Sequence, residues 1–250
     1  MKPFFKLKHL DILIQDDNNK KDVAKLMVEV LGYKNSIFFK AKHFVKNFII
    51  IRDMMLDISK TDYSKIEVNK NSPIKKQDSI NFICYSAMLE LQHLVNSTET
   101  SDMSKHIAKV IAISTFEKNR LSDYDSSSVY FKNHFDNILN QPILDMIGLY
   151  NFILEDIKIT SKHWEDLFFS VEVTDKDYEA AGGAAMSQFN VITTIKNTCA
   201  DFNCEEKQAW LKSYYLVQNN SYSKAYASFI QDTIRISKEA EIKARNPGPN

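Results

Sequence analysis

Apolar residues recur at the helical spacing of three and four positions along most of the chain, and this pattern limits the fold more than any other feature. It is clearest in one stretch whose apolar face comprises Ile80, Ile83, Cys84, Ala87, Met88, Leu91, Leu94 and Val95. A stripe of this kind buries one side of a helix against neighbouring helices. The sequence therefore predicts an all-α fold, a multi-helix bundle of about nine or ten helices.

The same periodicity and the polar stretches between the periodic segments give approximate helix bounds. Expected helices cover residues 18–31, 37–60, 79–95, 102–116, 128–139, 143–157, 162–173, 205–217 and 222–245, with further helical turns between 174 and 203. Lysine-rich residues 61–77 and serine-rich residues 121–128 are expected to be loops. A soft boundary near Gln141 separates an N-terminal helical portion, 1–141, from a C-terminal portion, 142–250; a single domain is the alternative.

The N-terminal segment does not fit the helical pattern as readily. Leu10, Ile12 and Ile14 alternate with their neighbours, which favours a short extended N-terminal arm over residues 4–15. The longest apolar run there is only three residues, so we do not expect a signal peptide.

Several residues indicate where helices begin and end. Asp102 is expected to begin one helix, Ser127 or Ser128 to start the next, and Ser161 to cap a further one. Asn203, followed three residues later by Glu206, fits a capping box. The next helix is expected to end at the pair Asn219 and Asn220.

Composition indicates an ordinary soluble globular protein that carries no long-range charge. Of the 250 residues, 44% are hydrophobic and 26% are charged, and 32 basic residues balance 32 acidic ones. Zero net charge argues against sequence-independent attraction to nucleic acid, so contact with nucleic acid is expected to be incidental. It also removes the self-repulsion that would oppose association with further copies.

Two of the five glycines, Gly182 and Gly183, are adjacent and are flanked on both sides by alanines. Inside a helix such a pair would cost about 2 kcal/mol relative to alanine, so the loss of side-chain volume is expected to serve a purpose. Two interpretations stay open: a break between two helices, or a close helix crossing or subunit contact. The interface hypothesis comprises Ala181, Gly182, Gly183, Ala184, Phe189, Arg235 and Arg245.

The motifs that carry chemistry are weak or missing. Glu90 and His93 have the ExxH spacing of di-iron bundles, but the sequence holds no second copy, so both are expected to be surface residues. Asp145 is expected to stabilise a helix start. No metalloprotease, nucleophile-elbow, phosphate-loop or dinucleotide motif occurs. We expect no catalytic, cofactor or metal site, no enzyme activity and no membrane span.

The order of segments resembles the all-helical virion and assembly proteins of tailed bacteriophages. The resemblance rests on NFICYSAMLELQHLV, SDMSKHIAKVIAIS, LSDYD, the short helix to NQP, IGLYNFIL, and AAGGAAMSQFNVITTIKNTCADFN followed by a helix pair. It implies a non-enzymatic protein of a phage particle, either a head-tail connector ring or a tail assembly chaperone.

The resemblance also implies partners and a location. Portal or tail components would be the partners, the protein would form a homo-oligomer in the assembled particle, and it would be found in the virion and, during assembly, in the host cytoplasm. A cellular helical adaptor or regulator is the alternative, and an enzyme with dispersed site residues is a third hypothesis.

Overall fold

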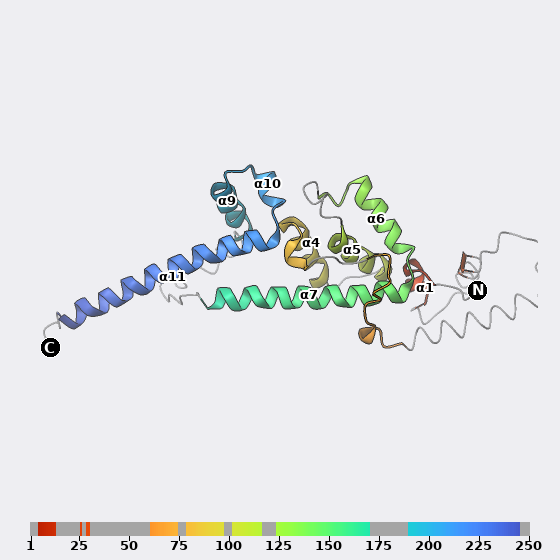
Figure 1. Ribbon diagram of the computed structural model, residues 1–250, viewed down its shortest axis with the longest axis horizontal. Helices are drawn as coiled ribbons and strands as arrows, with labels where there is room; N and C mark the ends of the chain where they lie inside the picture. The colour runs from red at the N-terminus through yellow and green to blue at the C-terminus, as the bar shows by residue number, and fades with distance from the viewer. Residues whose placement is uncertain are drawn as a thin grey trace, which may run out of the picture. The chain divides into compact units, whose positions relative to one another are not determined.

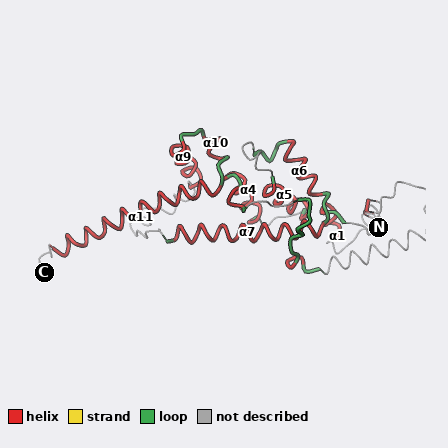
Figure 2. Tube along the Cα trace, in the orientation of Figure 1, coloured by secondary structure: helices red, strands yellow, loops and turns green. Residues whose placement is uncertain are grey.

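The protein is all-α. The computed structural model describes residues 5–13, 26, 29–30, 61–74, 79–97, 102–116, 124–170 and 190–245. These residues form eight α-helices and three 3-10 turns and include no strand (Figures 1 and 2). Two isolated β-bridges, Lys6 with Pro142 and Cys84 with Ser213, are the only extended pairings among them.

The chain divides into two compact units, neither of which is continuous in sequence. Unit 1 consists of residues 1–77, 90–117 and 125–155, and unit 2 of residues 78–89, 118–124 and 156–250. Two of the breaks between the units fall inside helices, after residue 89 in α4 (Tyr85–Asn96) and after residue 155 in α7 (Ile143–Phe169).

Helix α5 (Met103–Thr115) forms the core of unit 1, as its pattern predicts. Its residues Ile107, Val110, Ile111 and Ile113 are all buried. The Asp102 carboxylate caps it by accepting a hydrogen bond from the Lys105 backbone N–H at 3.1 Å. Helix α6 (Val129–Leu139) packs against α5, and the Ser128 hydroxyl caps it through the Phe131 N–H.

The extended arm expected at the N-terminus is wrong for residues 7–13. These residues form the 3-10 turn η1 (Leu7–His9) and helix α1 (Leu10–Leu13). Leu7, Leu10 and Leu13 are all buried, so the buried residues repeat every three positions, as on one face of a helix. The two-residue alternation of Leu10, Ile12 and Ile14, which suggested an extended chain, does not describe which side chains are buried. Extended pairing is confined to the preceding residues, where the Leu7 N–H donates to the Gln141 carbonyl and the Ile143 N–H to the Phe5 carbonyl.

The separate helices expected on either side of Ser161 are one helix. Helix α7 runs without interruption for 27 residues, so Ser161 caps nothing. Thr160, beside it, is buried inside the helix. No glycine or proline lies between Gly148 and the end of α7, so nothing in the backbone forces a break there.

Two helices do not begin where the sequence predicts, one starting later and the other earlier, because the backbone segments at their N-termini pair with each other. The helix expected from residue 79 starts only at α4 (Tyr85–Asn96), after the 3-10 turn η3 (Ile80–Phe82). The Tyr85 N–H donates to the Lys212 carbonyl at 2.8 Å, and the Tyr214 N–H donates to the Ile83 carbonyl at 2.7 Å. The paired segment around Cys84 separates η3 from α4. The paired segment around Ser213 separates α10 (Glu206–Trp210) from α11 (Tyr214–Arg245).

Helix α11 therefore continues through Asn219 and Asn220, where the sequence predicted an end. The Asn220 side-chain amide donates to the Asp201 carboxylate of α9 (Asn190–Phe202) at 2.7 Å, which explains an asparagine at this position. α9 and α10 lie over the first part of α11, and the rest of α11 extends beyond them (Figure 1).

Asn203 ends a helix and does not begin one. Its φ of 44° is left-handed, and the Cys204 N–H donates to the Cys199 carbonyl, as in a Schellman C-cap. Asparagine tolerates this conformation better than most residues. The N-cap of α10 is Glu205, which forms a capping box with Gln208.

Candidate functional site

The residues of the interface hypothesis divide into two groups. Ala181, Gly182, Gly183, Ala184 and Phe189 lie outside the described residues, so the close helix crossing stays a prediction. Arg235 and Arg245 lie on α11 and are exposed. Arg235 pairs within its own helix, with Asp232 at 3.4 Å and Glu239 at 3.2 Å, and these carboxylates raise its pKa. Such local pairs stabilise a helix slightly and leave the guanidinium accessible.

A row of large side chains follows one face of α11. We define the α11 stripe as Tyr222, Tyr226, Phe229, Thr233, Ile236 and Ala240. These positions alternate in steps of four and three, which keeps them on one side of a helix. The first three rings are in contact, with centroids 6.1 Å apart for Tyr222 and Tyr226 and 6.4 Å for Tyr226 and Phe229.

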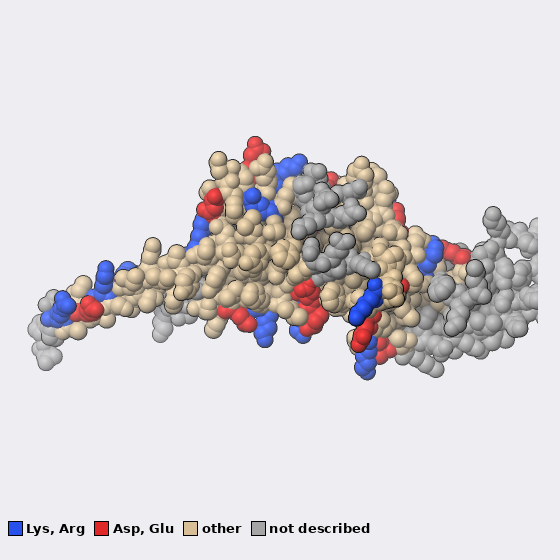
Figure 3. Space-filling model, viewed as in Figure 1, with Lys and Arg blue, Asp and Glu red and all other residues tan. Residues whose placement is uncertain are grey.

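The stripe begins in a packed region and continues into an exposed one. At its start, the Phe168 ring lies edge-on to Tyr222, 5.9 Å away. Further on, Tyr226 is 47% exposed and Ile236 is 50% exposed. In Figure 3, charged side chains of α11 gather near its C-terminal end, and uncharged residues cover the stretch before them. The polar final turns are exposed, as the sequence predicts.

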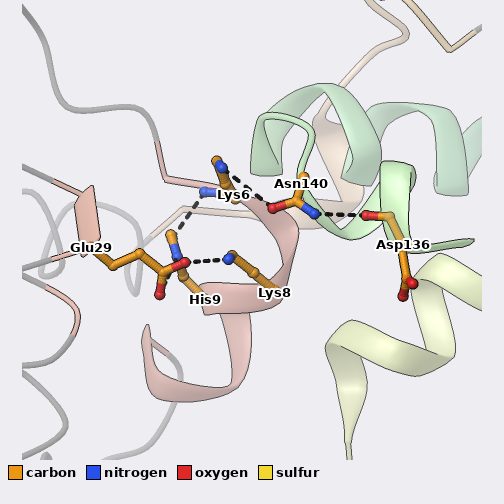
Figure 4. Close-up of polar contacts among 6 residues, drawn as sticks. All are labelled: Lys6, Lys8, His9, Glu29, Asp136 and Asn140. Atoms are coloured by element: carbon orange, nitrogen blue, oxygen red, sulfur yellow. Dashed lines mark hydrogen bonds and ion pairs between the residues drawn. The ribbon is translucent and has the colours of Figure 1, made fainter. Parts of the chain in front are cut away.

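A polar cluster near the N-terminus surrounds His9, a residue that the sequence patterns did not single out. His9 is 3% exposed, and its Nδ1 accepts a hydrogen bond from the Lys6 N–H at 3.1 Å. Its Nε2 lies 3.5 Å from a Glu29 carboxylate oxygen, and the same carboxylate pairs with the Lys8 ammonium (Figure 4). Burial lowers the pKa of His9, although the Glu29 charge opposes this effect.

This cluster attaches η1 to its neighbours. The Lys6 ammonium donates to the Asn140 side-chain carbonyl at 3.3 Å, and the Asn140 amide donates to the Asp136 backbone carbonyl at 2.8 Å (Figure 4). The contact between Lys6 and Asn140 thus holds η1 against the end of α6. The burial of Leu7 and Leu10 is the signal that would have located His9, because it lies between them on a tight turn.

The loop 61–74 lies on the first half of α7, and its contacts are the most specific of unit 1. The Asn151 amide donates to the Tyr63 carbonyl at 2.7 Å and to the Ile66 carbonyl at 3.3 Å. One turn earlier, Gly148 touches the loop backbone so closely that an added Cβ would collide with the Glu67 carbonyl oxygen. A further turn earlier, Asp145 accepts a hydrogen bond from the Asn69 amide at 2.9 Å. Asp145 stands in the first turn of α7, as expected.

Loop and helix together line a partly open cavity of about 260 Å³, with Phe152 at its rim half exposed. It is lined by Val68, Asn69, Lys70, Ser72, Ile74, Asp145, Leu149 and Phe152. Ile74 and Leu149 are buried apolar residues, and Ser72 is 3% exposed. The sequence predicted a surface loop here, which is confirmed for most of its residues, but nothing local marked Ser72 and Ile74 as buried.

Other polar pairs lie elsewhere among the described residues. The Tyr150 hydroxyl lies 3.3 Å from His106 Nε2, and the Thr115 hydroxyl lies 2.8 Å from His134 Nε2. Both histidines are half-buried. Glu90 pairs with Lys109 at 2.8 Å, and His93 is exposed as expected.

The described residues hold neither a metal-binding cluster nor a membrane-spanning helix. No group of three His, Cys, Asp or Glu side chains there is placed to hold a metal ion. Within the same residues, no helix combines the length and the apolar character needed to cross a membrane.

Comparison with known proteins identified no relative. The chain matches no protein-family model, no curated protein and no solved structure.

Proposed function

We propose that the protein is a non-enzymatic structural or assembly protein that acts through helix-mediated protein–protein contacts, with a second copy of the chain as the partner of α11. The observation that supports this is the exposed α11 stripe. Its four-three spacing is that of a coiled-coil seam, in which each large side chain inserts between residues of a facing helix.

The charge of the chain is consistent with self-association. Net charge is zero, so copies do not repel one another at long range. The stripe itself contains no charged residue. From Tyr222 to Ala240 it extends over about 27 Å of helix, which is enough for several layers of contact between two helices.

The setting that we propose is the particle of a tailed bacteriophage, as a head-tail connector ring or a similar virion component. The resemblance of the segment order supports it. A tail assembly chaperone and a cellular helical adaptor remain as alternatives that differ in their partners.

Self-association is tested by measuring the molar mass of the full chain by light scattering between about 1 and 100 μM, a range that brackets a micromolar dimer. We expect a concentration-dependent oligomer that Ile236→Ser weakens at least about tenfold, because it places a polar group in the seam.

Ile234→Ser is the matched control. Ile234 is also 50% exposed and lies only two positions from Ile236. Residues two positions apart lie on different faces of a helix, so Ile234 is not part of the α11 stripe. A monomer at all concentrations, or equal loss in both variants, would contradict self-association through the stripe.

The setting is tested separately by affinity purification of a tagged copy from its native source, followed by mass spectrometry. Recovery with portal, tail or capsid proteins in fixed ratio would support the virion. Recovery with tail proteins that are absent from the finished particle favours the chaperone, and a metabolic or regulatory partner contradicts the phage setting.

A further inference from the structure

The cavity between loop 61–74 and α7 takes no part in the proposed self-association. Its floor is apolar, with Leu149 and Phe152 contributed by α7 and Ile74 by the loop. Its volume, about 260 Å³, lies just below the range of about 300 to 1,000 Å³ that is typical of small-molecule sites. It therefore has room for a small molecule with a compact apolar group.

One polar side chain in the cavity lacks a partner. The Ser72 hydroxyl is buried, and no described residue forms a hydrogen bond with it. Native proteins rarely leave a buried hydroxyl unpaired, so a molecule in the cavity is expected to supply the bond. A hydroxyl both donates and accepts, so it does not by itself determine the charge of that molecule.

The two ionisable residues of the lining narrow the choice. Lys70 carries a positive charge and Asp145 a negative one. A ligand with only a positive charge would be opposed by Lys70, and one with only a negative charge by Asp145. A zwitterion can place its ammonium group near Asp145 and its carboxylate near Lys70 and Ser72.

We propose that this cavity binds a small aliphatic α-amino acid. The apolar side chain would lie against Leu149 and Phe152, and the two charged groups would face the two charged residues. One oxygen of Asp145 already accepts a bond from Asn69, so the carboxylate is held in place before the ligand arrives. Pre-organisation of this kind strengthens binding of small ligands.

Three probes with nearly the same carbon skeleton test the proposal: L-leucine as the zwitterion, 3-methylbutylamine as the cation and 4-methylpentanoate as the anion. Binding to the full chain is measured by saturation-transfer NMR with titration. We expect a Kd of about 0.1 to 1 mM for leucine, a strength suited to so few atoms, and at least about tenfold weaker binding of both singly charged probes.

Substitutions separate charge recognition from simple shape. Asp145→Asn should weaken leucine about tenfold while leaving 4-methylpentanoate unchanged or tighter, because it removes only the negative charge. Ser72→Ala should weaken leucine about tenfold. Lys70→Met should weaken leucine, because it removes the positive charge that faces the carboxylate. Lys132→Met, at an exposed lysine on α6, is its control and should change nothing.

Several results would overturn the proposal. Absence of saturation transfer from leucine at about 10 mM, well above the expected Kd, would show that the cavity holds only water. Equal binding of all three probes, or leucine binding that Asp145→Asn does not affect, would show an apolar depression without charge recognition. Far-UV circular dichroism of each variant confirms that the fold is intact.

Discussion

Gly148→Ala should destabilise the protein, even though alanine favours helices more than glycine does. The helix alone would gain about 1 kcal/mol from the exchange. Against this, the new Cβ would lie 2.8 Å from the Glu67 carbonyl carbon, so the loop must move away by about 0.7 Å or more to reach ordinary contact.

The cost of that movement can be estimated from the contacts it disturbs. Overpacking at a close backbone contact costs about 1 to 3 kcal/mol. The two hydrogen bonds from the Asn151 amide to the Tyr63 and Ile66 carbonyls contribute about 1 kcal/mol each, and both lengthen when the loop moves. We therefore expect a net loss of about 2 kcal/mol.

Two measurements check this estimate. Urea unfolding followed by far-UV circular dichroism gives the change in stability, and hydrogen–deuterium exchange reports on residues 61–74 directly. The Lys65 and Ser72 amides, which bond within the loop, should exchange faster in the variant.

Leu144→Ala is the control, because Leu144 is exposed one turn earlier on α7 and its change should stay within about 0.5 kcal/mol. The reasoning would be refuted if Gly148→Ala stabilised the protein by about 1 kcal/mol with loop exchange unchanged. That result would mean that α7 gains its helix propensity without meeting the loop.

Three further predictions concern other parts of the chain. Burial raises the pKa of Tyr85 to about 12, so the folded state holds the phenol proton more tightly than the unfolded state. The resulting contribution to stability, about 2 to 3 kcal/mol, is present below pH 10 and is lost as the pH rises towards 12. Tyr85→Phe should therefore reduce the fall in the free energy of unfolding over that pH range, as measured by urea unfolding at alkaline pH. Asn203→Gly should raise the free energy of unfolding by about 0.5 kcal/mol and Asn203→Val should lower it by about 1 to 2 kcal/mol, because φ is 44°; equal effects in thermal unfolding would contradict a left-handed cap. Ile111→Ala, at a fully buried site of α5, should cost about 2 to 5 kcal/mol by the same assay, and a loss below about 1 kcal/mol would be inconsistent with a packed core there.

The parts of the fold that depend on local signals could be predicted from the sequence. Helix α5 is the clearest case, because its cap and its apolar face are set by residues within one another's reach. The burial of Ile107 and Ile111 is confirmed, and the helix begins directly after Asp102, close to where it was expected.

Errors arose where distant residues determine the backbone. The start of α4 depends on hydrogen bonds to Lys212 and Tyr214, which lie far along the chain, and no local pattern encodes them. Because of the same pairing, α11 starts earlier in the sequence than expected, at Tyr214. Asn220, where a helix end was predicted, lies inside α11 and donates a hydrogen bond to Asp201.

The candidate sites differ in how far they could be predicted. Accessibility of the end of α11 follows from its polar sequence and was expected. The cavity was not, because Ser72 lies in a lysine- and asparagine-rich loop that resembles a solvated one, and its contact with α7 joins positions distant in sequence. A single glycine within a helical pattern, Gly148, was the one local indication of a close approach.

The interleaving of the two units has a consequence for synthesis on the ribosome. Unit 1 is complete once residue 155 has emerged, whereas residues 78–89 belong to unit 2 and must wait for partners near the C-terminus. Ile83 and Tyr85 pair with Tyr214 and Lys212, so these early residues lack their backbone partners until late in translation. Domains generally fold as units in the order of synthesis, and here that order gives unit 1 first and closes unit 2 only near chain release. A chain cut before residue 212 would leave Ile83 and Tyr85 without these backbone partners and η3 without its contacts with α11, open to chaperones and proteases.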